Sequence, residues 1–151
     1  MQLTRYTDYG IRILMYLAIQ PERVELFRIA EITQVFELSA NHVAKIVHHL
    51  GKLGYLKTIR GKNGGFRLAR FATEINLGSI VRELEHSLVQ VNCGEPYCRF
   101  TPVCNLKSIL AKALEAYLAV LDSYYLSDII NNKDKLLGSL ADPTISVLNL
   151  S

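Results

Sequence analysis

The sequence predicts a mainly α-helical protein that combines a winged helix-turn-helix domain with a long C-terminal dimerisation helix. Three features indicate this class: two amphipathic helical segments joined by a short turn, a basic glycine-rich hairpin directly after them, and a long apolar stripe in the second half. The same features divide the chain into residues 1–76, the winged domain, residues 77–131, a loop with the dimerisation helices, and residues 132–151, a tail of unknown role.

The first predicted helix covers residues 8–19. It is apolar on almost every face, so we expect it to be buried or shared with another subunit. Thr7 is a suitable N-cap, Asp8 suits the positive first turn, and Pro21 ends the helix. Asp8 and Arg12 lie four residues apart on one face, which predicts an ion pair.

Residues 28–36 and the segment from Ser39 to about Leu53 form the predicted helix pair. Ser39 is a good N-cap, and the helix after it alternates an apolar face with a polar one. Residues 24–26 are expected to form a short strand before the pair. A second helix that is polar near its N-terminus is typical of helix-turn-helix DNA recognition.

The hairpin after the helix pair is the predicted wing. Residues 55–60 and 66–70 alternate like two strands, with the glycine-rich turn 61–65 between them. The glycines do not follow the spacing of a nucleotide-binding loop, and a strand rather than a helix comes after them. Four cations give the predicted wing a basic rim: Arg60, Lys62, Arg67 and Arg70.

The second half of the chain predicts two further helices, over residues 77–84 and 105–125. The longer one would span roughly 30 Å at ~1.5 Å per residue. A domain of this size offers little core to cover so long an apolar stripe, so we interpret it as a dimer helix. Residues 126–130 are expected to add one turn. The stripe consists of Leu106, Ile109, Leu110, Ala113, Leu114, Tyr117, Leu118 and Leu121.

Charge is distributed unevenly along the chain. Residues 1–70 carry eleven Lys and Arg against five Asp and Glu, a net +6, while residues 71–151 carry six against nine, a net −3. A basic first half fits a polyanionic partner such as DNA. No uninterrupted apolar run of about 18 residues is present, so no membrane span is expected. The N-terminus lacks a signal-peptide pattern, which predicts a cytoplasmic protein whose thiols stay reduced.

All three cysteines, Cys93, Cys98 and Cys104, fall on one segment broken by two prolines and a glycine. Three clustered thiols on such a loop indicate a ligand set, and their odd number argues against a closed disulfide framework. Zinc sites commonly use paired Cys-x2-Cys turns, whereas an iron–sulfur cluster tolerates wider spacing because each iron is a separate attachment point. The spacing favours a cluster over zinc, and three cysteines leave one iron in need of another ligand.

The chain resembles the NsrR-type repressors, which sense nitric oxide and belong, with IscR, to the winged-helix iron–sulfur regulators. The resemblance covers residues 1–130, and the cysteine spacing is closer to the NsrR type than to IscR. It is carried by Met1-Gln2-Leu3-Thr4 with Thr7-Asp8-Tyr9-Gly10, by Asn41-His42 with Lys45-Ile46, by Arg60-Gly61-Lys62-Asn63-Gly64-Gly65, by Val81-Arg82-Glu83-Leu84-Glu85, and by the three cysteines followed by Leu106-Lys107.

The resemblance implies a homodimer with one [4Fe–4S] cluster per subunit, with [2Fe–2S] as the alternative. It implies that Cys93, Cys98 and Cys104 are joined by a fourth ligand, Asp8 of the partner subunit. Arg12, one turn from Asp8, would orient that carboxylate. The implied function is a repressor that binds double-stranded operator DNA while its cluster is intact and releases the DNA when nitric oxide attacks the cluster.

The second helix of the pair would then enter the major groove, and the wing would reach the minor groove or its phosphates. Two alternatives stay open: an iron–sulfur regulator that senses cluster or redox status, and a cluster-free winged-helix regulator whose thiols sense oxidation. An enzyme is not expected, because the sequence contains no nucleophile–base pattern and no phosphate loop. The candidate DNA-binding residues are Arg28, Ser39, Asn41, His42, Lys45, Arg60, Lys62, Asn63, Gly64 and Gly65.

Overall fold

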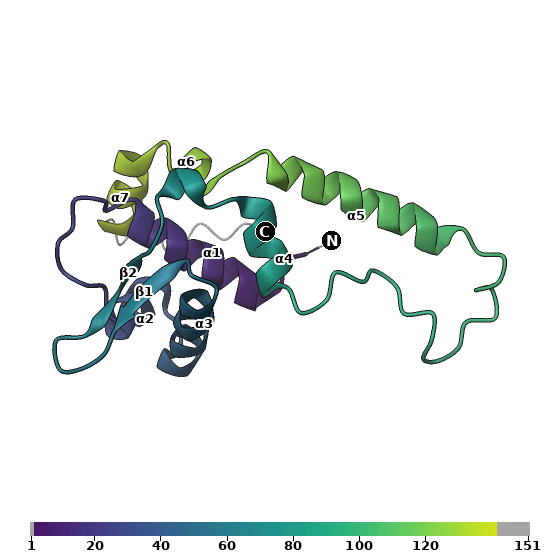
Figure 1. Ribbon diagram of the computed structural model, residues 1–151, viewed down its shortest axis with the longest axis horizontal. Helices are drawn as coiled ribbons and strands as arrows, with labels where there is room; N and C mark the ends of the chain where they lie inside the picture. The colour runs from purple at the N-terminus through teal and green to yellow at the C-terminus, as the bar shows by residue number, and fades with distance from the viewer. Residues whose placement is uncertain (1, 142–151) are drawn as a thin grey trace.

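One helix, with the loop before it, projects from the body that the other elements form (Figure 1). The computed structural model describes residues 2–141. That part of the chain holds seven α-helices, one 3-10 helix and one two-stranded antiparallel hairpin. In chain order the elements are α1 (Arg5–Ala18), α2 (Ile29–Phe36), α3 (Ala40–Lys52), β1 (Leu56–Ile59), β2 (Gly65–Leu68), η1 (Ala72–Glu74), α4 (Leu77–Leu84), α5 (Leu106–Asp122), α6 (Leu126–Ile129) and α7 (Lys133–Ala141).

Helix α1 runs through the body, and its apolar side chains, such as Ile13 and Leu14, are fully buried. It begins at Arg5, one turn earlier than the sequence predicted. Thr4 is the N-cap, and its hydroxyl oxygen accepts a hydrogen bond from the backbone N–H of Thr7 at 3.3 Å. Thr7, the predicted cap, lies instead inside the helix and is fully buried.

Helices α2 and α3 form the predicted helix-turn-helix. Glu37 ends α2 in the left-handed region, with φ 53° and ψ 39°, and so turns the chain toward α3. Ser39 caps α3 as predicted, because its Oγ accepts a hydrogen bond from the backbone N–H of His42 at 3.3 Å. The apolar face of α3 is buried in the core: Val43, Ile46, Val47 and Leu50.

The predicted wing is present as an antiparallel hairpin, with residues 56–59 opposite residues 65–68. Phe27 adds a one-residue bridge to it: its N–H donates to the carbonyl oxygen of Phe66, and the N–H of Phe66 donates back, both at 2.9 Å. The prediction of a strand at residues 24–26 is therefore wrong. The single pairing residue is Phe27, whose buried ring fixes the loop against the hairpin.

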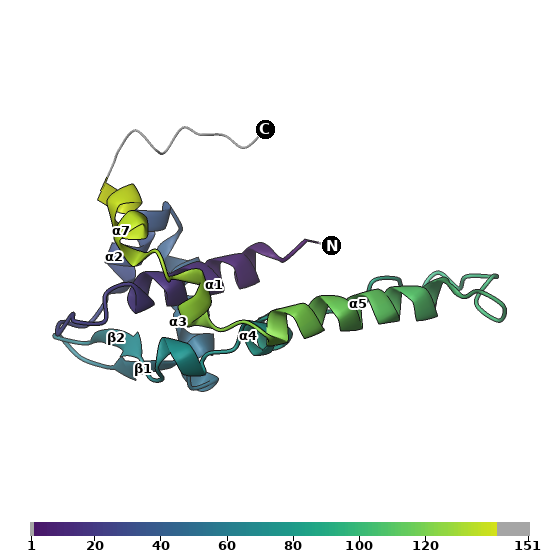
Figure 2. The same ribbon diagram turned by 90° about the horizontal axis from the view of Figure 1, so that it is seen from above.

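The C-terminal end of α5 is held against α4 by two polar contacts. Arg82 and Asp122 form a two-point ion pair, with Nη1–Oδ1 at 2.5 Å and Nη2–Oδ2 at 2.7 Å. The side-chain amide of Asn76, the N-cap of α4, donates to the main-chain oxygen of Asp122 at 2.8 Å. The N-terminal end of α5 extends away from the body, as two perpendicular views show (Figures 1 and 2). The helices predicted at residues 77–84 and 105–125 are both present.

Helix α6 returns the chain to the body, where Leu126 is fully buried and its N–H donates to the carbonyl oxygen of Ile75 at 2.8 Å. Residues of α7 line one pocket together with residues of α1, and Leu136 packs against the core. The sequence showed no strong pattern for this helix. Residues 142–151, the rest of the predicted tail, lie outside the described residues. From residue 2 to residue 141, no helix is both long and apolar enough to cross a bilayer.

Candidate cluster site and DNA-binding surface

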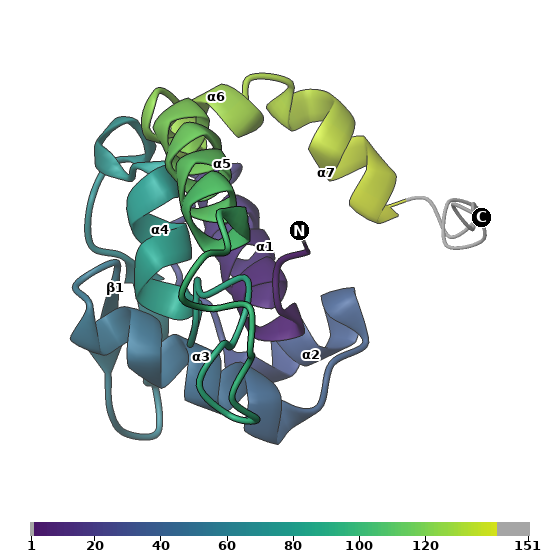
Figure 3. The same ribbon diagram turned by 90° about the vertical axis from the view of Figure 1, so that its right-hand side faces the viewer.

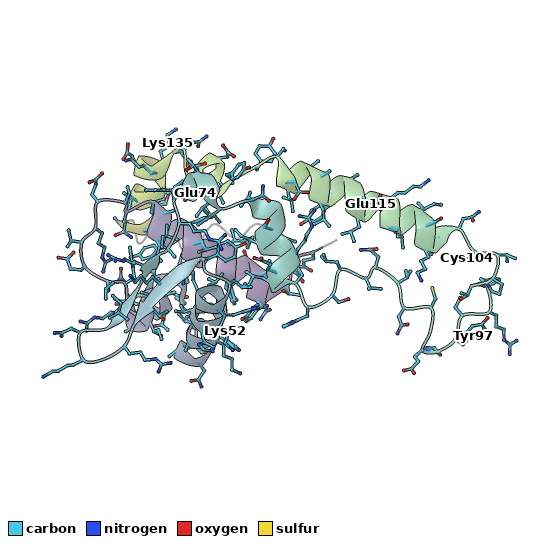
Figure 4. The ribbon with its side chains drawn as sticks, viewed as in Figure 1. Lys52, Glu74, Tyr97, Cys104, Glu115 and Lys135 are labelled. Atoms are coloured by element: carbon cyan, nitrogen blue, oxygen red, sulfur yellow. The ribbon has the colours of Figure 1, made fainter. Side chains whose placement is uncertain are left out.

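The three cysteines lie on the irregular segment between α4 and α5, at the projecting end of the molecule (Figure 4). Cys93, Cys98 and Cys104 are free thiols that line one pocket of about 240 Å³. The N–H of Cys98 donates to the carbonyl oxygen of Cys93 at 3.2 Å, which closes a turn between the first two thiols. The N–H of Leu106, at the start of α5, lies 3.4 Å from the sulfur of Cys104. The fold thus brings the predicted cysteine ligands to one place.

The side chains that the pocket offers to a bound group include three cysteine thiols, which are soft ligands. Within the described residues, no set of three His, Cys, Asp or Glu side chains is close enough together to hold a single metal ion. In an iron–sulfur cluster each cysteine binds a different iron, so the thiols need not meet at one atom. A backbone N–H directed at a thiol, as at Cys104, is the kind of donor that tunes cluster sulfurs. The donor set therefore fits an iron–sulfur cluster.

Asp8 does not lie in this pocket of its own chain. It is on α1 in the body, while the cysteine segment lies at the projecting end (Figures 1 and 4), and the pocket lining contains no residue of α1. The predicted ion pair is present, because Nε of Arg12 donates to Oδ1 of Asp8 at 2.8 Å. Both side chains are partly exposed. A cluster ligand from Asp8 therefore requires the partner subunit.

The N-terminal part of α3 and the tip of the wing point to the same side of the molecule (Figures 1 and 3). The candidate DNA-binding side chains are exposed there, and the wing glycines are half-buried. The exposed residues are Arg28, Ser39, Asn41, His42, Lys45, Arg60, Lys62 and Asn63. The structure thus gathers side chains from three elements, α2, α3 and the wing, into one polar and mainly basic surface.

The glycines of the wing have a steric role. A Cβ added at Gly64 would collide with the carbonyl oxygen of Ile59, and one added at Gly65 would collide with the carbonyl oxygen of Phe27. The two glycines let the turn fold back on itself and let the Phe27 loop approach β2. The two glycines are therefore needed for the shape of the wing. Direct DNA contact by either glycine stays a prediction.

Two polar side chains outside the predicted set lie in hollows beside it. Gln34, exposed on α2, lines a hollow of about 640 Å³ together with Arg28 and Asn63. Arg5, exposed at the start of α1, lines another of about 380 Å³ together with His42. The net positive charge of residues 1–70 is a sequence signal that points to Arg5 as a candidate DNA contact. No sequence signal places Gln34 beside the wing, because the hairpin's fold brings them together.

An ion pair braces the start of α2 against α1. Nη1 and Nη2 of Arg23 lie 2.5 and 2.9 Å from the two carboxylate oxygens of Glu31, and the hydroxyl of Tyr16 donates to Oε1 of Glu31 at 2.8 Å. The hydrogen bonds from Arg23, and then that from Tyr16, lower the pKa of Glu31 against the opposing effect of burial. Burial and the Glu31 carboxylate raise the pKa of Tyr16. The carboxylate is thus held ionised where the helix pair meets α1.

Comparison with protein families identifies the chain's relatives. The Rrf2 family, described as iron-dependent transcriptional regulators, matches residues 3–132. Two proteins named HTH-type transcriptional regulator NsrR, from Halalkalibacterium halodurans and Shouchella clausii, are each 45% identical to this chain over 143 residues. The matches cover 93% of this chain and 97% and 95% of those proteins. The resemblance to NsrR-type proteins is therefore confirmed.

Solved structures show the same fold. The IscR of T. potens superposes with a TM-score of 0.68 at 27% identity, over 87% of this chain and 88% of that one. CymR of B. subtilis, described as the global cysteine regulator, superposes with a TM-score of 0.66 at 26% identity, over 87% of this chain and 98% of that one. These similarities confirm the predicted winged-helix class. The relatives named above are transcriptional regulators, which agrees with the expectation of a non-enzymatic role. The chain belongs to the Rrf2 family of transcriptional regulators.

Proposed function

We propose that this chain is a nitric-oxide-responsive repressor. It binds operator DNA as a homodimer while each subunit holds an iron–sulfur cluster, and it releases the DNA when nitric oxide reacts with that cluster. The observation that supports this most is that all three thiols share one pocket on the projecting segment, apart from the polar surface of α3 and the wing. Such a division suits a protein that senses at one place and binds DNA at another.

Helix α5 supports the homodimer. Leu118 is its only buried residue. Leu106 and Ile109 are 51% and 60% exposed, and Val103, just before the helix, is 83% exposed. Apolar side chains that are open to water over a continuous surface mark an interaction site. A second copy of the chain carries the same stripe on its own α5 and would cover it through a two-fold symmetric contact.

The three cysteines would hold one cluster per subunit, [4Fe–4S] or, as the alternative, [2Fe–2S], with Asp8 of the partner subunit as the remaining ligand. When bound, the cluster supplies iron to which nitric oxide binds. A carboxylate is a harder ligand than a thiolate and suits cluster iron less well. Arg12 orients that carboxylate through its hydrogen bond. Asp8 is therefore the ligand that gives way most easily.

On the DNA side, the exposed part of α3, with Asn41, His42 and Lys45, would meet base edges and phosphates in the major groove. The wing would contact the adjacent minor groove. A dimer must hold its two recognition helices about one helical turn, ~34 Å, apart to fit both half-sites. When Asp8 leaves its position in the partner subunit, that spacing is lost. A coupling of a few kcal/mol then lowers DNA affinity by orders of magnitude.

The test is made on anaerobically purified protein. Iron and sulfide are counted, the absorbance spectrum is recorded, and DNA fragments are selected from a random pool by the cluster-loaded protein. Affinity for the selected fragment is then measured by fluorescence anisotropy before and after addition of nitric oxide, at several salt concentrations. We expect a coloured dimer whose binding weakens steeply with salt and is lost after nitric oxide.

Two outcomes would overturn the proposal. A colourless protein without iron or sulfide, whose DNA binding follows thiol oxidation, would favour the cluster-free regulator. A cluster-loaded protein whose affinity changes with reduction of the cluster, and not with nitric oxide, would favour a sensor of redox status.

A further inference from the structure

The first turn of α1 carries Asp8 and contacts two functional parts of the molecule, the start of the cysteine segment and α3. Its cap, Thr4, contacts the end of α4: the backbone N–H and the hydroxyl of Thr4 both donate to Oε1 of Glu85, at 2.8 and 3.1 Å. Glu85 is the C-cap of α4 and opens the segment that leads to the cysteines. The same turn carries Asp8. The helix start is thus tied to the beginning of the cysteine segment.

Tyr6, in the middle of this turn, contacts the recognition helix. Its hydroxyl oxygen lies 3.0 Å from Nδ1 of His49 and 3.5 Å from the carbonyl oxygen of Lys45, both on α3. The ring of Tyr6 also lies near two imidazoles, with ring centroids 5.9 Å from His49 and 5.7 Å from His86. His86 is the residue after Glu85. One side chain therefore joins α3 to the start of the cysteine segment.

The turn itself is stiff. Thr7 is fully buried, and its hydroxyl oxygen lies 3.1 Å from that of Thr4. Gly10, one turn further on, lets α4 pack closely, because a Cβ there would lie 2.6 Å from Cδ1 of Leu84. A stiff turn held at several points moves as a unit when one point is displaced. A shift of Asp8 would therefore move Tyr6.

We propose that Tyr6 is the positioning residue that couples Asp8 to the recognition helix. This inference rests on the proposed function. While Asp8 is held in the partner subunit, the first turn of α1 is fixed, and Tyr6 fixes α3 through His49. When Asp8 is released, the turn shifts together with the Glu85–His86 segment, and α3 loses the contact that sets its orientation. Tyr6 lies outside the cysteine pocket, so it acts on the cluster site only through the elements that it joins, and it lines the hollow beside His42 together with Tyr9.

The decisive variant is Tyr6→Phe, which keeps the ring near the two imidazoles and removes the hydroxyl. Its matched control is Tyr9→Phe on the same helix, because the Tyr9 hydroxyl makes no hydrogen bond within residues 2–141. For each protein, DNA affinity is measured in the cluster-loaded and the cluster-free form, and the ratio of the two affinities is the coupling. Iron content, absorbance and thermal unfolding are recorded alongside.

We expect Tyr6→Phe to keep its cluster spectrum and its fold, and to lower the affinity ratio by five-fold or more, while Tyr9→Phe keeps the wild-type ratio. His49→Ala, which removes the same contact from the side of α3, should lower the ratio equally, and the double variant should fall no further. His49→Ala also provides the test if Tyr6→Phe unfolds. In the cluster-loaded protein, Tyr6→Phe should also shift the nitrogen resonance of the His49 Nδ1.

The outcomes are separable. A wild-type ratio near one would overturn the proposed function and this inference with it. A large wild-type ratio that persists in Tyr6→Phe, or an equal loss of affinity in both forms, would overturn the role of Tyr6 alone and leave the proposed function standing.

Discussion

Arg12 and Asp8 are linked across one turn of α1, with Nε of the arginine 2.8 Å from Oδ1 of the aspartate. The pair lies on the surface, since the two side chains are 54% and 38% exposed. Pairs of this kind contribute only about 0.3–0.5 kcal/mol to the stability of a helix. The carboxylate is therefore available for another role at little cost to the fold.

Asp8→Ala should leave the free energy of unfolding within about 0.5 kcal/mol of wild type and change the cluster's absorbance spectrum or its rate of loss. The reason is that the variant removes a proposed ligand and only an exposed ion pair. Anaerobic absorbance during chelator challenge measures the effect. Asp134→Ala, an exposed acid on α7, is the control. An unchanged spectrum together with an unchanged nitric oxide response would remove Asp8 from the ligand set.

Lys62→Ala should weaken binding to all DNA sequences alike and reduce the slope of log affinity against log salt by about 0.9, because it removes one phosphate contact. Anisotropy titrations on a specific and a random duplex over a range of salt concentrations measure both quantities. Lys135→Ala is the matched control, since Lys135 lies on α7, on the side of the molecule away from α3 (Figure 4). A loss confined to one base position would mean that Lys62 reads sequence.

Gly65→Ala should destabilise the protein by about 1–3 kcal/mol and disorder the wing, because the new Cβ collides with the carbonyl oxygen of Phe27. Gly138→Ala provides the opposite case. Gly138 lies inside α7, and a Cβ added there would meet no atom within 4 Å, so a methyl group should raise stability by up to about 1 kcal/mol. Chemical denaturation compares the two variants. If both substitutions changed the free energy of unfolding equally, backbone entropy rather than the collision would explain the effect of Gly65→Ala.

Acid should weaken the joint between α1 and α2. The pKa of Glu31 is lowered in the folded protein, first by the hydrogen bonds from Arg23. A lowered folded-state pKa contributes stability that is complete above the unfolded value, about 4.3, and is lost as the pH falls through the folded value. We expect this contribution to the free energy of unfolding to be lost as the pH falls below about 4.3. Glu31→Gln should flatten that part of the stability profile, whereas Glu22→Gln, an exposed residue of the loop after α1, should keep it.

Ile109→Glu should convert the dimer to monomers and leave the fold intact, because Ile109 is 60% exposed on its own chain and would be covered only by a partner. Analytical ultracentrifugation measures the oligomeric state. Ala111→Glu places the same charge on an exposed position of α5 outside the apolar stripe. A dimer that survives the first substitution would show that another surface joins the subunits.

The helix pair and the wing could be predicted because local signals determine their limits. Ser39 caps α3, Asn76 caps α4, and the glycine-rich turn separates two alternating segments. The start of α1 was misplaced because Thr4 and Thr7 are both suitable caps. The choice between them depends on Glu85, 81 residues away along the chain, which binds Thr4.

The remaining differences also arise from contacts between distant segments. Phe27 pairs with Phe66 only after the hairpin has formed, so the loop before α2 carries no strand signal of its own. Helix α7 shows a weak apolar pattern because it lies on the body mainly through Leu136. The cysteine set was visible in the sequence since its members are neighbours along the chain. Its proposed fourth ligand comes from another subunit and stays a prediction.

The ion pair between Arg82 and Asp122 fixes the C-terminal end of α5 and leaves its N-terminal end free of the body. The helix is held against the body from about Tyr117 to Asp122, while the cysteines lie beyond its first residue. The part before Tyr117 is about 16 Å long at 1.5 Å per residue, so a tilt of about 10° at the held end would swing the free end by about 3 Å. Conversely, a displacement of the thiols would rotate α5 by a small angle about the end that is held against α4. A change in a few bonds at the cysteines can thus reorient the whole body.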